Sequence, residues 1–146
     1  MKGNINVVIS NNRLCYNLTL DRRITIIKGK SGTGKTTLYN MVDSLCKTSR
    51  PVGLNCNCRD RLLVMTNMTY KYIVKDNICN KIILVDEYDF STLDMSEFIN
   101  NSDNYFIIFT RSCRFSNIRD YSDGSLYELK TSKINNMSVT NLVHLG

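Results

Sequence analysis

Residues 29–37 carry the clearest chemical signal in the sequence. They read Gly-Lys-Ser-Gly-Thr-Gly-Lys-Thr-Thr and fit the spacing G-x-x-x-x-G-K-[ST]. Glycines permit backbone conformations in which consecutive N–H groups converge on phosphate oxygens. A helix that begins directly after such a loop adds unpaired N–H donors and a partial positive charge. The spacing therefore predicts a loop that binds the phosphates of a nucleotide.

Each polar residue of this loop has an expected role. We expect Lys35 to reach the β- and γ-phosphates, the Thr36 hydroxyl to ligate Mg²⁺, and Thr37 to contact the α-phosphate. Lys30 stands at an unconstrained position and is expected to be solvated. The predicted nucleotide-binding residues are Gly29, Ser31, Gly32, Thr33, Gly34, Lys35, Thr36 and Thr37. The plain alternative is a glycine-rich turn that caps a helix beside an exposed lysine.

Two adjacent carboxylates, Asp86 and Glu87, follow the apolar residues 82–85. A buried strand of this kind beside the strand that enters the loop would bring Asp86 to the Mg²⁺ ion. Glu87 would then accept a proton from the water that attacks the γ-phosphate. Asp89 is a weaker substitute for Glu87. The alternative is that the two acids form a solvated strand end.

A second apolar run, residues 105–109, ends in Thr110 and Arg111. Ligands of open parallel sheets bind beyond the carboxyl ends of the strands. We therefore expect Thr110 to orient the attacking water and Arg111 to offset charge in the transition state. The predicted catalytic residues are Lys35, Glu87, Thr110 and Arg111, and the predicted metal ligands are Thr36 and Asp86.

These residues require strands and helices that alternate along the chain. Apolar, β-prone runs predict strands at residues 24–27, 62–66, 82–85, 105–109 and 126–130, and a hairpin of 5–10 with 14–20 that turns at Asn11-Asn12. Helical spacing predicts a helix from Gly34, a short helix near 70–78, and one after a capping box at Ser91. The segment after Thr131 carries no interpretable pattern.

The alternation predicts an α/β fold in which helices cover both faces of a mostly parallel sheet. With 146 residues, 42% of them hydrophobic, the chain fits one domain, residues 1–146. No segment resembles a signal peptide or is long enough to cross a bilayer. We therefore expect a soluble, cytoplasmic protein that does not contact membranes.

The six cysteines are expected to be reduced thiols. Cys56 and Cys58, with Cys46 upstream, suggest a zinc site, but a second pair of ligands is missing. A net charge of +6 and a pI near 9.1 admit nucleic acid as a partner. The basic residues are nevertheless scattered, so charge alone does not decide this.

Together, residues 29–37 and 82–87 resemble the Walker A and Walker B motifs of additional-strand P-loop ATPases, the division that holds AAA+, RecA-like and ABC-type proteins. The resemblance spans about residues 23–130 and is specific only in the two motifs. It implies a three-layer sandwich whose five-stranded core has the order 5-1-4-3-2. The strand that ends in Thr110 would separate the two motif strands, and the N-terminal hairpin would lie at one side.

Residues 16–27, which precede the loop, look most like the segment that enters the phosphate-binding loop of an ABC-type ATPase. However, the chain has no LSGGQ-like signature, no glutamine for a Q-loop, and no switch histidine after Thr110. A complete ABC-type ATPase domain is therefore excluded, and the chain resembles minimal stand-alone ATP-binding proteins.

Three functions follow as expectations. The first is slow hydrolysis of Mg-ATP by a switch or accessory ATPase, with a protein partner or a second copy of the chain completing the site. The second is a small-molecule kinase, because residues 86–90 resemble the acidic motif of thymidine kinases. The third is a nucleotide-dependent module that binds nucleic acid. A GTPase is not favoured, because the sequence has no N-K-x-D motif.

Overall fold

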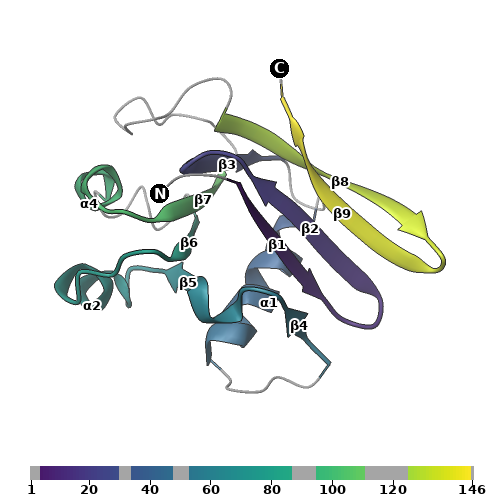
Figure 1. The fold of residues 1–146 in the computed structure, drawn as a ribbon, viewed down its shortest axis with the longest axis horizontal. Helices are drawn as coiled ribbons and strands as arrows, with labels where there is room; N and C mark the ends of the chain where they lie inside the picture. Colours follow the sequence, from purple (N-terminus) through teal and green to yellow (C-terminus); the bar gives the residue numbers. More distant parts are fainter. Residues whose placement is uncertain (1–3, 30–33, 48–52, 87–94, 111–124, 146) are drawn as a thin grey trace.

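One mixed sheet of nine strands dominates the fold, and Figure 1 shows how it curls. The computed structural model describes residues 4–29, 34–47, 53–86, 95–110 and 125–145. The strands are β1 (Ile5–Ser10), β2 (Leu14–Leu20), β3 (Ile24–Lys28), β4 (Asn55–Cys56), β5 (Leu62–Met65), β6 (Ile82–Asp86), β7 (Tyr105–Thr110), β8 (Leu126–Ile134) and β9 (Met137–His144). Their order across the sheet is β4-β1-β2-β9-β8-β3-β7-β6-β5.

Helices are few in the described part of the chain. They are α1 (Lys35–Lys47), α2 (Tyr70–Lys75), α4 (Ser96–Asn101) and the 3₁₀ turn η1 (Arg59–Arg61). The expected fold class, a three-layer sandwich around a mostly parallel five-stranded sheet, is therefore wrong. The two hairpins cause the difference, because they join the sheet instead of flanking it. β9 pairs antiparallel with β8 and parallel with β2, so the sheet continues through β1 to β4 and curls.

The strands nearest the predicted site run in parallel. β7 lies between β3 and β6 and pairs in parallel with both of them. The expected separation of the two motif strands by the strand that ends in Thr110 is thus present. β8 and β5 extend this parallel part on either side. The carboxyl ends of β3, β7 and β6 consequently meet at one edge of the sheet.

Asparagines close both hairpins, by different means. Asn11 Oδ1 accepts hydrogen bonds from the backbone N–H groups of Arg13 and Leu14, each at 2.8 Å. The expected turn is therefore made by a side chain, and neither Asn11 nor Asn12 has a positive φ. Asn135 and Asn136, by contrast, have φ of 51° and 66°, as a two-residue type I′ turn requires.

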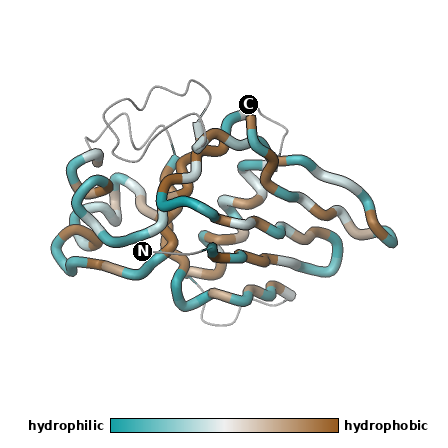
Figure 2. Tube along the Cα trace, turned by 45° about the horizontal axis from the view of Figure 1, so that its top comes forward, coloured by the Kyte–Doolittle hydropathy of each residue, from teal (hydrophilic) through white to brown (hydrophobic). Residues whose placement is uncertain are grey.

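The sheet curls around α1, whose apolar stripe lies against its inner face (Figure 1). Buried side chains from α1 and from the strands at both ends of the sheet form this inner cluster: Val7, Ile9, Tyr16, Leu18, Leu20, Ile27, Leu38, Met41, Val42, Leu45, Leu62, Val64, Ile82, Leu84, Tyr105, Ile107, Phe109 and Leu129. Figure 2 shows hydrophobic residues gathered along the central strands. The predicted stripe of α1 is confirmed, because its four apolar residues are all buried.

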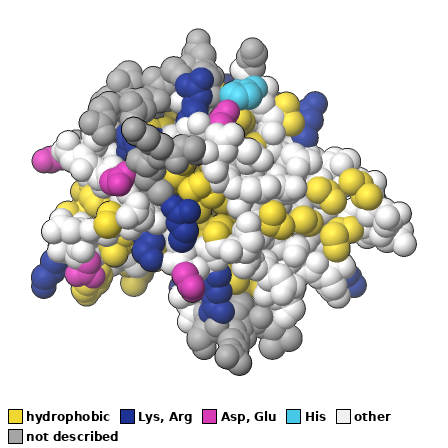
Figure 3. Space-filling model, viewed as in Figure 1, with side chains coloured by type: hydrophobic (Ala, Val, Ile, Leu, Met, Phe, Trp, Pro, Cys, Tyr) yellow, Lys and Arg dark blue, Asp and Glu magenta, His cyan; other side chains and the backbone are white. Residues whose placement is uncertain are grey.

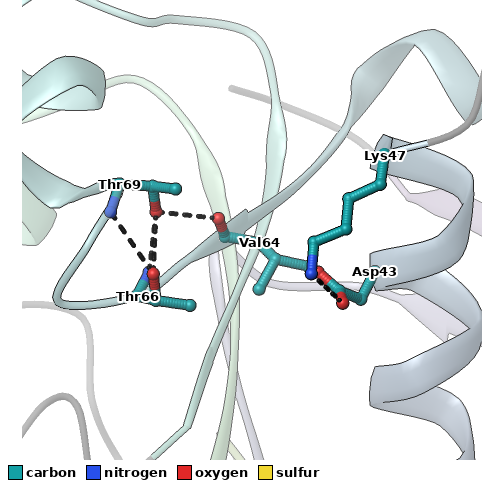
Figure 4. A network of polar contacts seen from close by, with 5 residues as sticks. All are labelled: Asp43, Lys47, Val64, Thr66 and Thr69. Atoms are coloured by element: carbon teal, nitrogen blue, oxygen red, sulfur yellow. Dashed lines mark hydrogen bonds and ion pairs between the residues drawn. The ribbon is translucent and has the colours of Figure 1, made fainter.

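The outer face of the parallel strands is covered by α2 and α4. Ile73 of α2 and Ile99 of α4 are buried there against Phe106 and its neighbours. Two threonines fix the start of α2, as Figure 4 shows: Thr69 Oγ1 donates to the Val64 carbonyl at 3.2 Å and accepts from the Thr66 N–H at 2.9 Å. The capping box expected at Ser91 lies outside the described residues.

The end of the C-terminal hairpin is anchored beside the turn between β2 and β3. Tyr127 of β8 donates a hydrogen bond to Asp21 Oδ1 at 2.5 Å. Its ring lies 4.3 Å, centroid to centroid, from the ring of His144. Burial, with the Asp21 carboxylate, raises the pKa of Tyr127. Among the helices in the described ranges, none is long and apolar enough to cross a membrane.

Candidate phosphate-binding site

The loop between β3 and α1 follows a strand whose first four residues are buried. Residues 24–27 are at most 1% exposed, and the strand ends at the exposed Lys28. Gly34 stands immediately before α1 with φ +95°, a conformation that side-chain-bearing residues rarely adopt. A Cβ added at Gly34 would meet Tyr16 Oη at 3.1 Å. The backbone conformation therefore favours glycine at this position, and an added Cβ would need the Tyr16 hydroxyl to move by a few tenths of an ångström.

Tyr16 of β2 fixes the start of α1. Its side chain is 3% exposed, and its hydroxyl donates to the Gly34 carbonyl at 2.9 Å. The same carbonyl accepts the first hydrogen bond of the helix, from Leu38 N–H at 3.0 Å. Burial raises the pKa of Tyr16, and a hydrogen bond with the Thr37 side chain opposes this shift. The N-terminal hairpin is thus joined directly to the predicted phosphate site.

Lys35 connects the ends of three elements. Its ammonium donates to the carbonyl of Gly29, at the end of β3, and to that of Thr110, at the end of β7, 3.3 Å away. The Gly29 N–H also donates to the Thr110 carbonyl, at 3.4 Å. The positive charge of Lys35 is therefore held at the first turn of α1, where β3 and β7 end side by side.

Thr110 is 1% exposed and contributes its carbonyl to this junction. Side chains alternate between the faces of a strand. Because Phe109 belongs to the inner cluster, Thr110 points its side chain to the outer face, as Phe106 and Ile108 do. That Thr110 orients the attacking water stays a prediction; the contact that the structure describes is between its backbone carbonyl and Lys35.

Asp86 is half-buried at the end of β6. It pairs with Phe109, which pairs with Ile27, so the three residues form one row across the sheet. With strands spaced about 4.8 Å apart, the Asp86 and Ile27 backbones lie about 10 Å apart. The alternation of β6 puts Asp86 on the same face as Leu84, the face that holds α1. The carboxylate therefore lies on the α1 side of the sheet edge.

Thr36 and Thr37 are exposed in the first turn of α1. A hydroxyl and a carboxylate are oxygen donors of the kind Mg²⁺ prefers, and this ion usually takes few protein ligands beside water and phosphate. Thr36 and Asp86 fit that role by chemical type. No group of three or more His, Cys, Asp or Glu residues that could hold a metal ion occurs in the described part of the chain.

Five predicted site residues lie outside the described residues: Ser31, Gly32, Thr33, Glu87 and Arg111. Two features of the site were missed from the sequence. The alternation of Tyr16 with Leu18 and Leu20 indicates burial, but nothing in it signals a bond to Gly34. The contact of the Thr110 carbonyl with Lys35 could not be predicted either, because every residue carries a backbone carbonyl.

Comparisons of this chain with known protein families, with curated proteins and with solved structures find no match.

Proposed function

We propose that the chain binds Mg-ATP at the junction of β3 and α1 and hydrolyses it slowly, as a switch or accessory ATPase. The observation that carries the proposal is the position of the Lys35 ammonium against the carbonyls of Gly29 and Thr110. This charge lies at the N-terminus of a helix of 13 residues. The N–H groups of such a terminus attract anions as well.

The chemistry of the neighbouring side chains supports a nucleotide with its metal ion. Lys35 would donate to β- and γ-phosphate oxygens, which accept stronger hydrogen bonds than carbonyls do because they are charged. Thr36 and Asp86 would supply oxygen ligands to Mg²⁺. Glu87, directly after Asp86, is the expected general base. Slow turnover follows if a second component must bring further positive charge to the transition state.

Neither alternative function has a specific observation in its favour. A nucleic-acid module would be expected to gather its basic residues into one stripe or patch. Figure 3 shows Lys and Arg side chains at separate places over the face that it draws. A kinase would need an acceptor site, and the residues proposed for its acidic motif lie largely outside the described ranges.

Phosphate release from Mg-ATP by the purified chain tests the proposal, with Glu87→Gln measured beside it. We expect slow release that Glu87→Gln abolishes while nucleotide binding is retained. Adding nucleosides distinguishes a kinase, because an acceptor would then consume ATP faster than water does. Release that is unchanged in Glu87→Gln, or an equal loss of binding, would contradict the assigned roles.

A further inference from the structure

Two thiols face each other at the end of the short edge strand β4. The sulfur atoms of Cys56 and Cys58 lie 3.9 Å apart, and both side chains are half-buried. Cys56 pairs with Ile9 of β1, so one of the two thiols belongs to the sheet itself. This pair takes no part in the proposed nucleotide site.

Asn57 holds the backbone between the two cysteines. Its side-chain oxygen accepts from the Val8 N–H at 3.0 Å, and its side-chain nitrogen donates to the Asn6 carbonyl at 2.8 Å. Its own N–H donates to the Val8 carbonyl at 3.3 Å. Asn57 therefore binds β1 through three hydrogen bonds where β4 has already ended. Asn57 therefore fixes the backbone from which the two thiols extend, and their sulfur atoms lie 3.9 Å apart.

The two thiols differ in acidity. A hydrogen bond from the Cys58 thiol lowers the pKa of Cys56 to about 7, helped by the Cys58 N–H and by the charge of Arg59, while burial acts in the opposite direction. The pKa of Cys58 is raised, by the same thiol contact and by burial. At neutral pH Cys56 is consequently the better source of thiolate, which is the form that reacts with oxidants.

We propose that Cys56 and Cys58 form a reversible, oxidant-sensitive dithiol that a hydroperoxide converts to a disulfide. The Cys56 thiolate attacks a peroxide oxygen, the O–O bond breaks, and a sulfenic acid forms while the departing alkoxide or hydroxide takes a proton from water. The Cys58 sulfur then attacks the Cys56 sulfur. The S–S bond forms, the S–O bond breaks, and hydroxide leaves with the Cys58 proton as water.

The geometry favours this pairing over the other described cysteines. The sulfurs must approach from 3.9 Å to about 2 Å, which side-chain rotation can supply in part. Cys46 instead donates its thiol hydrogen to the Leu62 carbonyl at 3.3 Å, and burial raises its pKa. A disulfide that spans a single residue is strained, and strained disulfides are the readily reduced ones. The bond is therefore expected to open again with glutathione.

Peptide mapping of the full chain after hydrogen peroxide treatment tests the proposal. Trypsin does not cut before Pro51, so its peptide 48–59 contains Cys56 and Cys58 and no other cysteine. We expect this peptide to lose two hydrogen atoms, to resist alkylation, and to regain both thiols with glutathione. At pH 7 before oxidation, Cys56 should react with iodoacetamide several-fold faster than the exposed Cys79.

Variants separate the two roles. Cys58→Ser should stop at a sulfenic acid on Cys56 that dimedone traps, while Cys56→Ser should leave Cys58 unreactive. Cys79→Ser is the matched control and should oxidise like the natural chain; circular dichroism checks that each variant folds. Two alkylatable thiols in peptide 48–59 after peroxide, or a disulfide from this peptide to Cys46, would overturn the proposal.

Discussion

The hydroxyl of Tyr16 lies 2.9 Å from the carbonyl of Gly34 and donates a hydrogen bond to it. This contact joins β2, in the N-terminal hairpin, to the residue that precedes α1. The hairpin was expected to be an addition at one side of the sheet. Through this bond it instead positions the first turn of the helix at the proposed phosphate site.

Removing the hydroxyl in Tyr16→Phe should weaken both folding and nucleotide binding. The loss of hydrogen bonds to Gly34 and Thr37 is expected to lower the free energy of unfolding by about 0.5–1.5 kcal/mol for each bond. Urea unfolding measures this, with Tyr72→Phe as the control because Tyr72 is 70% exposed. Equal stability of the two variants would argue against a structural role for the Tyr16 hydroxyl.

The substitution Gly34→Ala should destabilise the chain more than Gly53→Ala. Both glycines have positive φ, but only at Gly34 would an added Cβ meet another side chain, at 3.1 Å. Backbone strain alone costs about 1–2 kcal/mol, so Gly53→Ala reports that cost and Gly34→Ala adds the contact with Tyr16. Urea midpoints that shift equally in the two variants would contradict the close approach.

Asp86→Asn should weaken the dependence of nucleotide binding on Mg²⁺. A neutral amide is a poorer ligand for this ion than a carboxylate, so the stimulation of ATP binding by magnesium is expected to fall several-fold. Titration with and without the metal measures the effect, and Asp76→Asn at the exposed end of α2 is the control. Full magnesium stimulation in Asp86→Asn would remove Asp86 from the proposed metal site.

The lowered pKa of Cys56 should make the stability of the folded chain depend on pH. Because its pKa is lowered from 9.0 to about 7 in the folded chain, the unfolded chain binds more protons between these values. The natural chain should therefore gain stability relative to Cys56→Ser as pH rises from 7 toward 9, and lose this gain as pH falls through 7. A difference that is constant with pH would show that Cys56 is not the acidic thiol.

The turn between β8 and β9 depends on its asparagines. Asn136→Ala places an alanine at φ 66°, which should cost about 1–2 kcal/mol because only glycine and asparagine adopt this region easily. Asn136→Gly should retain stability. Asn12→Ala, in the other hairpin and without a positive φ, should have little effect. Thermal unfolding of the three variants checks this ranking.

Local patterns predicted most of the elements but not the architecture. The apolar runs identify β1, β2, β3, β5, β6 and β7 within a residue or two, because burial of a strand leaves a continuous or alternating signal. β9 was missed, although Asn135-Asn136 is the same pair of residues that marks the first turn. Without β9 nothing joins the two hairpins, so the nine-stranded sheet could not be foreseen.

The candidate site was likewise predicted in its local sequence patterns but not in its long-range contacts. Gly34, Lys35 and Asp86 could be identified from the sequence, because each belongs to a motif of neighbouring residues. The contacts of Tyr16 with Gly34 and of Lys35 with Thr110 could not, because they join residues 18 and 75 positions apart. Such contacts depend on how the sheet curls around α1.

Calorimetric binding of Mg-ATP to Lys35→Ala, beside Lys47→Ala, tests the central claim most directly. Lys47 ends the same helix, is 74% exposed, and forms an ion pair with Asp43 at 2.9 Å (Figure 4), so its removal deletes the same charge away from the site. We predict that Lys35→Ala binds about 10- to 100-fold more weakly, the equivalent of about 1.5–3 kcal/mol for hydrogen bonds to a charged group. Lys47→Ala should bind like the natural chain. Equal affinity in Lys35→Ala and Lys47→Ala would contradict the assignment of residues 29–37 as a phosphate-binding loop.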